Sequence, residues 1–255
     1  MKGLLVRILF VFILFIGASC ARQGVITQVS TIDALMTGVY DGEMTLADLK
    51  QKGDFGLGTF NTLDGEMVVL DGQFYRATAA GAVERPDMNT KTPFAAVTFF
   101  KPDRRVSISK GLDFQKVSQQ ADSRIPTPNI FYAIRITGTF QMVKTRSVPA
   151  QEKPYKALSE VVKTQPVFDL KHLEGTIIGF RCPSYVKGVN VPGYHLHFLS
   201  ADRTSGGHVL DFSIENGTLE MSEIKEFFLM LPSDKAFYNA DLSQDRGKEL
   251  RAVEK

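Results

Sequence analysis

Three of the four histidines of this 255-residue chain lie close together, on two strand-like runs that a polar turn separates. The first run, 194–199, is dense in aromatic and aliphatic residues, and the second, 208–212, has the same character. Because side chains alternate between the two faces of a strand, His195 and His197 share one face. A hairpin then brings His208 across from them. The stretch therefore predicts a β-hairpin in the second half of the chain, with three imidazoles on one side.

Three imidazoles that converge from neighbouring strands are typical of a catalytic metal site. Such a site has three protein ligands and leaves a coordination position open, whereas structural zinc usually has four protein ligands. Imidazole also suits copper, iron and nickel, so the ligand type does not fix the ion, and zinc is the ion that we expect. The alternative is that these histidines are surface or core polar groups that cluster by chance.

The first twenty residues have the three parts of a secretory signal. Lys2 and Arg7 supply positive charge, residues 8–16 form an apolar run, and small residues precede Cys20. The apolar run is too short for a comfortable transmembrane helix. A cysteine directly after small residues resembles a bacterial lipobox, although Gly17 stands where an aliphatic residue is usual; an ordinary cleaved signal is the alternative. We expect a signal peptide of the lipoprotein type at 1–20 and an exported protein, periplasmic or at the cell surface, anchored to the membrane through Cys20.

The charge balance argues against several classes of partner. The chain has 30 basic and 28 acidic residues, and the only charges in the leader are two of the basic ones, so the remainder is balanced. No basic field indicates a nucleic acid or an anionic membrane surface as partner.

Cys20 belongs to the leader, which leaves Cys182 as the one other cysteine, so no disulfide is expected. We expect Cys182 to be a small buried hydrophobe.

Strand-like runs dominate the rest of the chain, and short helices interrupt them. Asp71-Gly72 separates two β-rich runs, which is a strong hairpin signal. The expected strands lie at 65–70, 73–76, 95–100, 130–140, 176–180 and 219–230. The expected helices lie at 31–36, 45–50, 113–122 and 155–163, and a charged tail follows from 239.

This pattern predicts an α+β fold with a predominantly antiparallel or mixed β-sheet in two packed halves and a few short helices. The metal site would lie on a β-hairpin of the C-terminal half. A weak boundary falls near 145–170, where prolines and a helix interrupt the strands. The glycine-spaced run 53–60 has no strand before it and no helix after it, so we expect a loop with closely approaching backbones rather than a phosphate-binding loop.

Four separated groups of motifs resemble the alpha-acetolactate decarboxylase family. Together they span about residues 31–254 in the family's order, and we therefore take 21–255 as one catalytic unit. The motifs are 58–60, 63–66 and 71–76 near the N-terminus, 145–149 and 151–155 in the centre, 193–198, 202–203 and 206–209 at the histidines, and 241–243, 245, 249–250 and 253–254 in the tail.

The resemblance implies a lyase that converts 2-acetolactate to acetoin and carbon dioxide. It also implies (R)-acetoin as product, a homodimer, and a zinc ion held by His195, His197 and His208. At matching positions Arg146 is similar to the family's catalytic arginine, and Glu66 and Glu254 are similar to its functional carboxylates. The tail departs from the family pattern at 247–248 and 251–252. It therefore leaves open whether Glu249 or Glu254 enters the site, and we favour Glu254.

The chemistry of this reaction suits those residue types. Loss of carbon dioxide leaves an electron pair that the neighbouring ketone accepts as an enediolate, and a divalent ion can stabilise that charge as a Lewis acid. Arg146 could hold the carboxylate or enediolate through paired hydrogen bonds. Glu66 or Glu254 could donate the proton, ligate the metal or orient one of its ligands. Without the resemblance, the sequence favours a turn residue at Glu66 over a functional one. It favours a surface arginine and a functional arginine equally at Arg146.

Two other functions compete with the decarboxylase. A cupin-like metalloenzyme also carries a His-x-His pair on a strand, but it usually has a glutamate a few residues later, and 198–201 contain none. A lipid-anchored metal-binding protein without enzymatic activity would need neither Arg146 nor an acidic tail.

Overall fold

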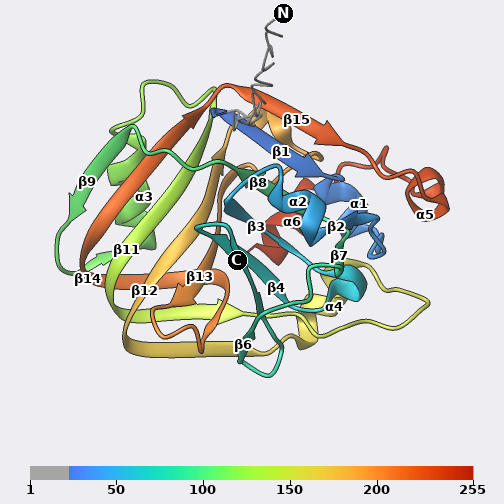
Figure 1. Ribbon diagram of the computed structural model, residues 1–255, viewed down its shortest axis with the longest axis horizontal. Helices are drawn as coiled ribbons and strands as arrows, with labels where there is room; N and C mark the ends of the chain where they lie inside the picture. The colour runs from blue at the N-terminus through green and yellow to red at the C-terminus, as the bar shows by residue number, and fades with distance from the viewer. Residues whose placement is uncertain (1–22, 255) are drawn as a thin grey trace, which may run out of the picture.

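Two β-sheets make up most of the structure, a computed structural model that describes residues 23–254 (Figure 1). One sheet has seven strands in the order β15-β1-β8-β3-β4-β5-β6. Its neighbours pair antiparallel, except for the parallel pair β1 and β15. Its strands are β1 (Val25–Val29), β3 (Phe55–Thr59), β4 (Glu66–Leu70), β5 (Gln73–Ala77), β6 (Val83–Glu84), β8 (Ala95–Thr98) and β15 (Glu226–Met230).

The second sheet has six antiparallel strands, three of them long. It runs in the order β10-β14-β11-β12-β13, with β9 also paired to β14 and with β13 and β14 paired at the histidines. Its strands are β9 (Arg104–Ile108), β10 (Leu112–Asp113), β11 (Phe131–Arg146), β12 (Val167–Cys182), β13 (Gly193–Ser200) and β14 (Gly206–Ile224). A separate small ladder joins β2 (Met44–Thr45) to β7 (Lys91–Thr92).

The helices are short, and several begin at the capping residues that the sequence offers. Thr31 and Thr45 accept hydrogen bonds from backbone N–H groups three residues later, as N-caps do. The α-helices are α1 (Ile32–Met36), α2 (Leu46–Lys50), α3 (Phe114–Asp122), α4 (Leu158–Val161), α5 (Lys235–Asn239) and α6 (Gly247–Val253). The 3-10 turns are η1 (Asn61–Leu63), η2 (Val162–Thr164) and η3 (Ser184–Val186).

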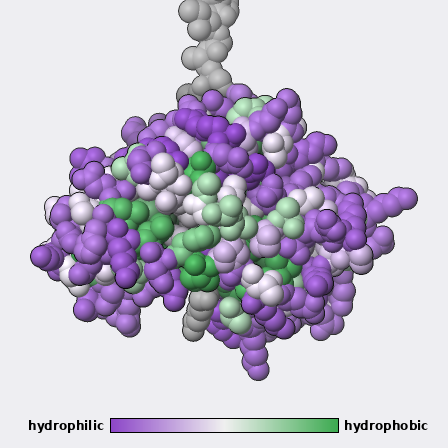
Figure 2. Space-filling view, turned by 90° about the horizontal axis from the view of Figure 1, so that it is seen from below, coloured by the Kyte–Doolittle hydropathy of each residue, from purple (hydrophilic) through white to green (hydrophobic). Residues whose placement is uncertain are grey.

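The two sheets share one hydrophobic core. Leu57 and Val68 of the seven-stranded sheet are buried in the same cluster as Ile178 and Leu199 of the six-stranded sheet. Cys182 also lies there, and burial raises the pKa of its thiol to about 12, which confirms a small buried hydrophobe. A second cluster packs α3 on the six-stranded sheet, and a third joins α1, α4 and α6. The face shown in Figure 2 is largely hydrophilic, with apolar residues in a broken band across its middle.

The α+β fold with few short helices is confirmed, but the expectation of a loop at 53–60 is wrong. Residues 55–59 form β3, an interior strand between β8 and β4. A Cβ at Gly56 would overlap the carbonyl oxygen of Ala96 on the neighbouring strand, and one at Gly58 would overlap that of Phe94. The glycines therefore mark closely approaching backbones, as expected, but within a sheet.

Residues 147–166, where the sequence predicts a break, connect β11 to β12, which pair with each other along their length. The chain crosses from one sheet to the other between β8 and β9. The leader, including Cys20, lies outside the described residues. Among residues 23–254, no helix is long and apolar enough to span a membrane.

Candidate active site

The three clustered histidines lie on a β-hairpin, as predicted. His197 of β13 pairs directly with His208 of β14, and His195 lies two residues earlier on the same face. The ring centroids are 5.1 to 5.4 Å apart, and one nitrogen of each ring lies within 4.8 Å of the others. The turn is held by the Ser200 hydroxyl, which accepts hydrogen bonds from the backbone N–H groups of Thr204 and Ser205.

A backbone hydrogen bond fixes the tautomer of one histidine. Nδ1 of His197 lies 2.7 Å from the carbonyl oxygen of Met67, which can only accept, so Nδ1 carries the proton and donates it. The lone pair is then on Nε2. Nε2 of His197 and Nε2 of His208 are both buried without a hydrogen-bond partner. Buried polar atoms are rarely left unpaired, so these two nitrogens, with one ring nitrogen of His195 within 4.8 Å of them, suit a cation that would accept their lone pairs.

All three imidazoles are neutral at ordinary pH. Burial lowers the pKa of His195 to about 3, and the charge of Arg146 lowers it further in the same direction. Burial also holds the pKa values of His197 and His208 well below the usual range. The neutral imidazole is the form that binds a metal, because protonation removes the lone pair. These side chains could therefore hold a metal ion without first losing protons.

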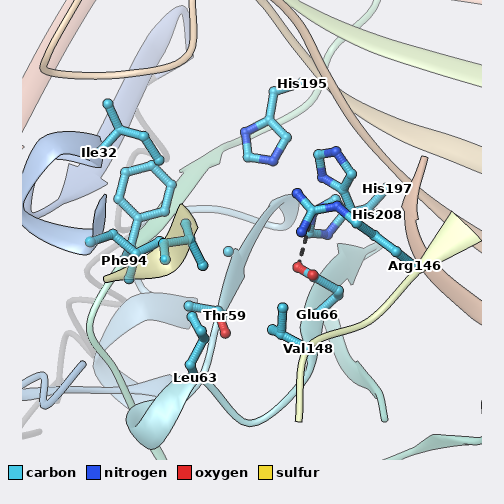
Figure 3. Close-up of a pocket in the computed structure, with 13 residues that line it drawn as sticks. Ile32, Thr59, Leu63, Glu66, Phe94, Arg146, Val148, His195, His197 and His208 are labelled. Atoms are coloured by element: carbon cyan, nitrogen blue, oxygen red, sulfur yellow. Dashed lines mark ion pairs between the residues drawn. The ribbon is translucent and has the colours of Figure 1, made fainter. Parts of the chain in front are cut away.

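Glu66 begins β4 and lies beside the histidines (Figure 3). Its Oε2 is 3.5 Å from Nε2 of His197, the contact drawn as a dashed line. Burial raises the pKa of this carboxyl to about 7; the nearby Arg146 opposes that shift and Glu254 adds to it. The preceding Gly65 has φ of 88° and lies so close to β5 that a Cβ would be 2.5 Å from the Ala77 carbonyl oxygen. This tight turn is what directs Glu66 inward.

Glu254 reaches the same place from the C-terminal segment. The helix before it, α6, packs by Leu250 and Val253 against the cluster that includes α1 and α4. Oε2 of Glu254 is 3.7 Å from Nε2 of His208 and 3.9 Å from Nε2 of His195. Burial raises the pKa of Glu254 to about 7, with the charge of Arg146 opposing. Of the two glutamates that the sequence left open, Glu249 is exposed and pairs with Arg246 instead.

Arg146 is the last residue of β11 and is only 4% exposed. It pairs in register with His208, which places its side chain at the histidine face. Nη1 donates to Oε1 of Gln165 at 2.8 Å, and Nη2 is 4.0 Å from Oε1 of Glu254. Nε has no partner. The structure therefore brings together all six residues that the sequence and the resemblance singled out.

Five of these six side chains, all except Glu254, line a small cavity of about 40 Å³. Histidines, Glu66 and Arg146 form its polar wall (Figure 3). The opposite wall is apolar and is made of Ile32, Leu35, Leu63, Phe94, Val148 and Leu158. Such a cavity suits a small molecule with oxygen atoms at one end and methyl groups at the other, and it excludes much of the surrounding water.

Sequence reasoning missed the apolar wall and Gln165. Two of the wall residues come from α1, and the other four come singly from η1, the loop before β8, the segment after β11, and α4, so no motif joins them. Gln165 is one residue between η2 and Pro166. The only sequence signal is that Val148 follows closely after Arg146 and Leu63 precedes Glu66, inside two of the family motifs.

As a set, these groups can do three things chemically. Three neutral nitrogen donors can bind a divalent cation, a buried guanidinium can hold an anionic group, and two carboxyls with pKa values about 7 can hold or release a proton near neutral pH. Carboxyls and a cation converging on one metal-binding cavity are typical of an enzyme active site.

The comparisons with known proteins agree in one family. The family model described as Alpha-acetolactate decarboxylase matches residues 26–244. A curated relative of that name from Methanosarcina mazei is 47% identical over 231 residues, which is 91% of this chain and 80% of the relative. Another, from Brevibacillus brevis, is 43% identical over 239 residues, which is 94% of this chain and 84% of that relative. A crystal structure of alpha-acetolactate decarboxylase from Bacillus subtilis strain 168 has a TM-score of 0.89 at 43% identity and covers 90% of this chain and 99% of that one. The chain therefore belongs to the alpha-acetolactate decarboxylase family.

Proposed function

We propose that this protein is a zinc-dependent alpha-acetolactate decarboxylase, which converts 2-acetolactate to acetoin and carbon dioxide. One observation carries the proposal: three neutral histidines, the carboxyl of Glu66 and a buried arginine line one small cavity, and the carboxyl of Glu254 lies within 4 Å of two of those histidines. Its support is the family to which the chain belongs, whose relatives carry that name.

The donor set fits a divalent metal. His195, His197 and His208 would hold it, because one ring nitrogen of each lies within 4.8 Å of the others. Three neutral ligands do not offset the charge of the ion, so its full double charge faces the substrate. Three imidazole nitrogens are also a usual ligand set for catalytic zinc. When bound, the ion supplies Lewis acidity toward the oxygen atoms of the substrate. The carbonyl of Met67 orients His197 from behind, as a second layer of contacts does in metal sites.

Arg146 recognises the carboxylate that leaves as carbon dioxide. Its guanidinium is buried, and a buried cation attracts an anion more strongly than one in water. Two N–H groups of a guanidinium can bond both oxygens of a carboxylate, which fixes its plane relative to the carbon that it leaves. The apolar wall opposite, with Phe94 and Leu158, accommodates the two methyl groups of the substrate.

A carboxyl group donates the proton that replaces carbon dioxide on carbon. Glu66, from β4, lies beside His197, and Glu254, after α6, lies beside His195 and His208. Because burial raises both pKa values to about 7, each carboxyl is partly protonated near neutral pH and can act as an acid there. Proton transfer from a positioned side chain is typically worth roughly 100- to 10,000-fold in rate.

The experiment measures bound metal and acetoin formation on the same preparations. Wild type is expected to contain zinc and to form acetoin from 2-acetolactate, and His197→Ala is expected to lose both. His172→Asn is the matched control, because His172 is the fourth histidine, is exposed and has φ of 49°, which asparagine tolerates. Full metal content without acetoin in the wild type would instead favour a metal-binding protein or a different metalloenzyme.

We also propose that the protein is exported and anchored to the membrane through a lipid on Cys20, which becomes the first residue of the mature protein when the residues before it are removed as a signal. The support is the order of basic, apolar and small residues in the leader. Mass spectrometry of the mature N-terminus tests it, since an unmodified mature N-terminus would contradict the anchor. The homodimer that the resemblance implies is tested by sedimentation of the mature form.

A further inference from the structure

The guanidinium of Arg146 is held by one side-chain hydrogen bond, and the acceptor is neutral. Oε1 of Gln165 lies 2.8 Å from Nη1. The nearest carboxylate oxygen, on Glu254, is 4.0 Å from Nη2 and beyond hydrogen-bond range. Buried arginines more often pair with a carboxylate, because a buried charge is costly unless it is paired. The neutral amide of Gln165 is therefore an unusual hydrogen-bond partner for a buried arginine.

Backbone contacts already fix the chain around Gln165. The N–H of Ser147 donates to the carbonyl of Pro166, and Arg146 pairs with Val167 at the start of β12. The side chain of Gln165 is only partly buried and makes no other hydrogen bond that the structure records among the described residues. The fold of this segment thus does not depend on the amide, and its contact with Arg146 is what the amide contributes.

A neutral acceptor does what a carboxylate could not do here. It directs the guanidinium by a hydrogen bond to a charged donor, which is stronger than one between neutral groups. It also adds no further negative charge beside that of Glu254, so that more of the positive charge of the arginine remains available for an anionic ligand in the cavity. Nε, which has no partner, is one of the donors left for that ligand.

We propose that Gln165 is a positioning residue that aims the Arg146 guanidinium at the substrate carboxylate while leaving its charge intact. This inference rests on the proposed function in taking that carboxylate as the anion. It assigns a role in the site to the segment that follows α4, the helix that contributes Leu158 to the apolar wall.

The test separates carboxylate recognition from general damage by comparing two small ligands. 2-Hydroxy-2-methylpropanoate has the carboxylate and hydroxyl of the substrate but no ketone, and acetoin has the ketone and hydroxyl but no carboxylate. Their dissociation constants are measured by calorimetry on metal-containing protein, so no turnover is needed. The variants are Gln165→Leu, which removes the acceptor, and Gln165→Glu, which keeps an acceptor but adds a negative charge; Lys163→Gln, at an exposed position of the same segment, is the control.

Both variants are expected to bind the carboxylate ligand at least roughly tenfold more weakly, the scale of one hydrogen bond to a charged group. Acetoin affinity, metal content and Tm should stay close to those of the wild type and of Lys163→Gln. Unchanged carboxylate affinity in Gln165→Glu, or an equal loss for acetoin, would overturn the proposal. If Gln165→Leu does not fold, the Gln165→Glu comparison decides. Acetoin formation by the wild type tests the proposed function separately, because the dissociation constants of the two ligands are measured without turnover.

Discussion

Replacement of Leu250 by alanine should release the segment that carries Glu254 while the rest of the protein stays folded. The helix α6 has seven residues and would be marginal in water by itself, so its docking depends on the side chains that it buries. Leu250 is 4% exposed and Val253 is 1% exposed. Each such burial contributes about 1.5–3 kcal/mol, and a buried Leu→Ala change costs about 2–5 kcal/mol. The loss is therefore comparable with the docking energy itself.

A loss near the low end of that range already has a large effect, since each 1.4 kcal/mol changes an equilibrium about tenfold. We expect faster amide hydrogen exchange in residues 247–254, measured by mass spectrometry. We also expect a kcat roughly 100-fold lower, because Glu254, one of the two proposed acids, moves away from the histidines. Metal content and the main unfolding transition should change little. A global loss would instead lower the Tm by roughly 2–4 °C per kcal/mol.

The matched control is Lys248→Ala, which changes an exposed residue of the same helix to a good helix former. Wild-type exchange in 247–254 of Leu250→Ala would refute the view that Leu250 holds the helix in place. Fast exchange with an unchanged kcat would refute the role of Glu254 in the reaction.

Three further predictions concern the metal, the pH dependence of stability and the interior glycines. Dialysis against a chelator should abolish acetoin formation and lower the Tm, since a ligand of the folded state stabilises it, and zinc should restore both; His208→Ala should purify without metal by elemental analysis. Burial raises the pKa of Glu66 from its usual 4.5 to about 7, so the folded state keeps a proton that the unfolded state loses, and this contribution to stability is lost as the pH rises through 7. In metal-free protein, the free energy of unfolding in urea should therefore fall for the wild type relative to Glu66→Gln as the pH rises from 4.5 to about 7. A difference in unfolding free energy that stays constant with pH would contradict the shifted pKa. Gly56→Ala places a methyl group against the Ala96 carbonyl and should cost at least roughly 1–3 kcal/mol by calorimetry. Gly111→Ala, with open space around it but φ of 80°, measures the cost of backbone strain without that clash.

The histidine hairpin could be predicted from the sequence because its information is local. Alternation along β13, a polar turn and a second run at β14 suffice to place His195, His197 and His208 on one face. The strand-rich α+β class follows in the same way from many short β-patterns. The role of Glu66 could not be obtained locally, because its approach to His197 depends on β4 lying against β13, which only the packing of the two sheets decides.

The errors and omissions have the same origin. Glycines at 56 and 58 weaken any strand pattern, yet β3 needs them because β8 approaches so closely. The charged tail contains a helix whose burial rests on Leu250 and Val253, too few for a visible period. Gln165 is a single amide with no pattern around it, and only its distance to Arg146 gives it meaning.

The pairing of β1 with β15 has a consequence for how the chain reaches this structure. Val25 pairs with Glu226, so the seven-stranded sheet gains its last strand from a segment made roughly 200 residues later. Contacts between such distant parts of a chain slow folding, because a long loop must close before any of them forms. On a ribosome, the edge of β1 would stay unpaired while the whole six-stranded sheet is synthesised. Newly made chains should therefore depend on chaperones during that interval more than the stability of the finished fold suggests.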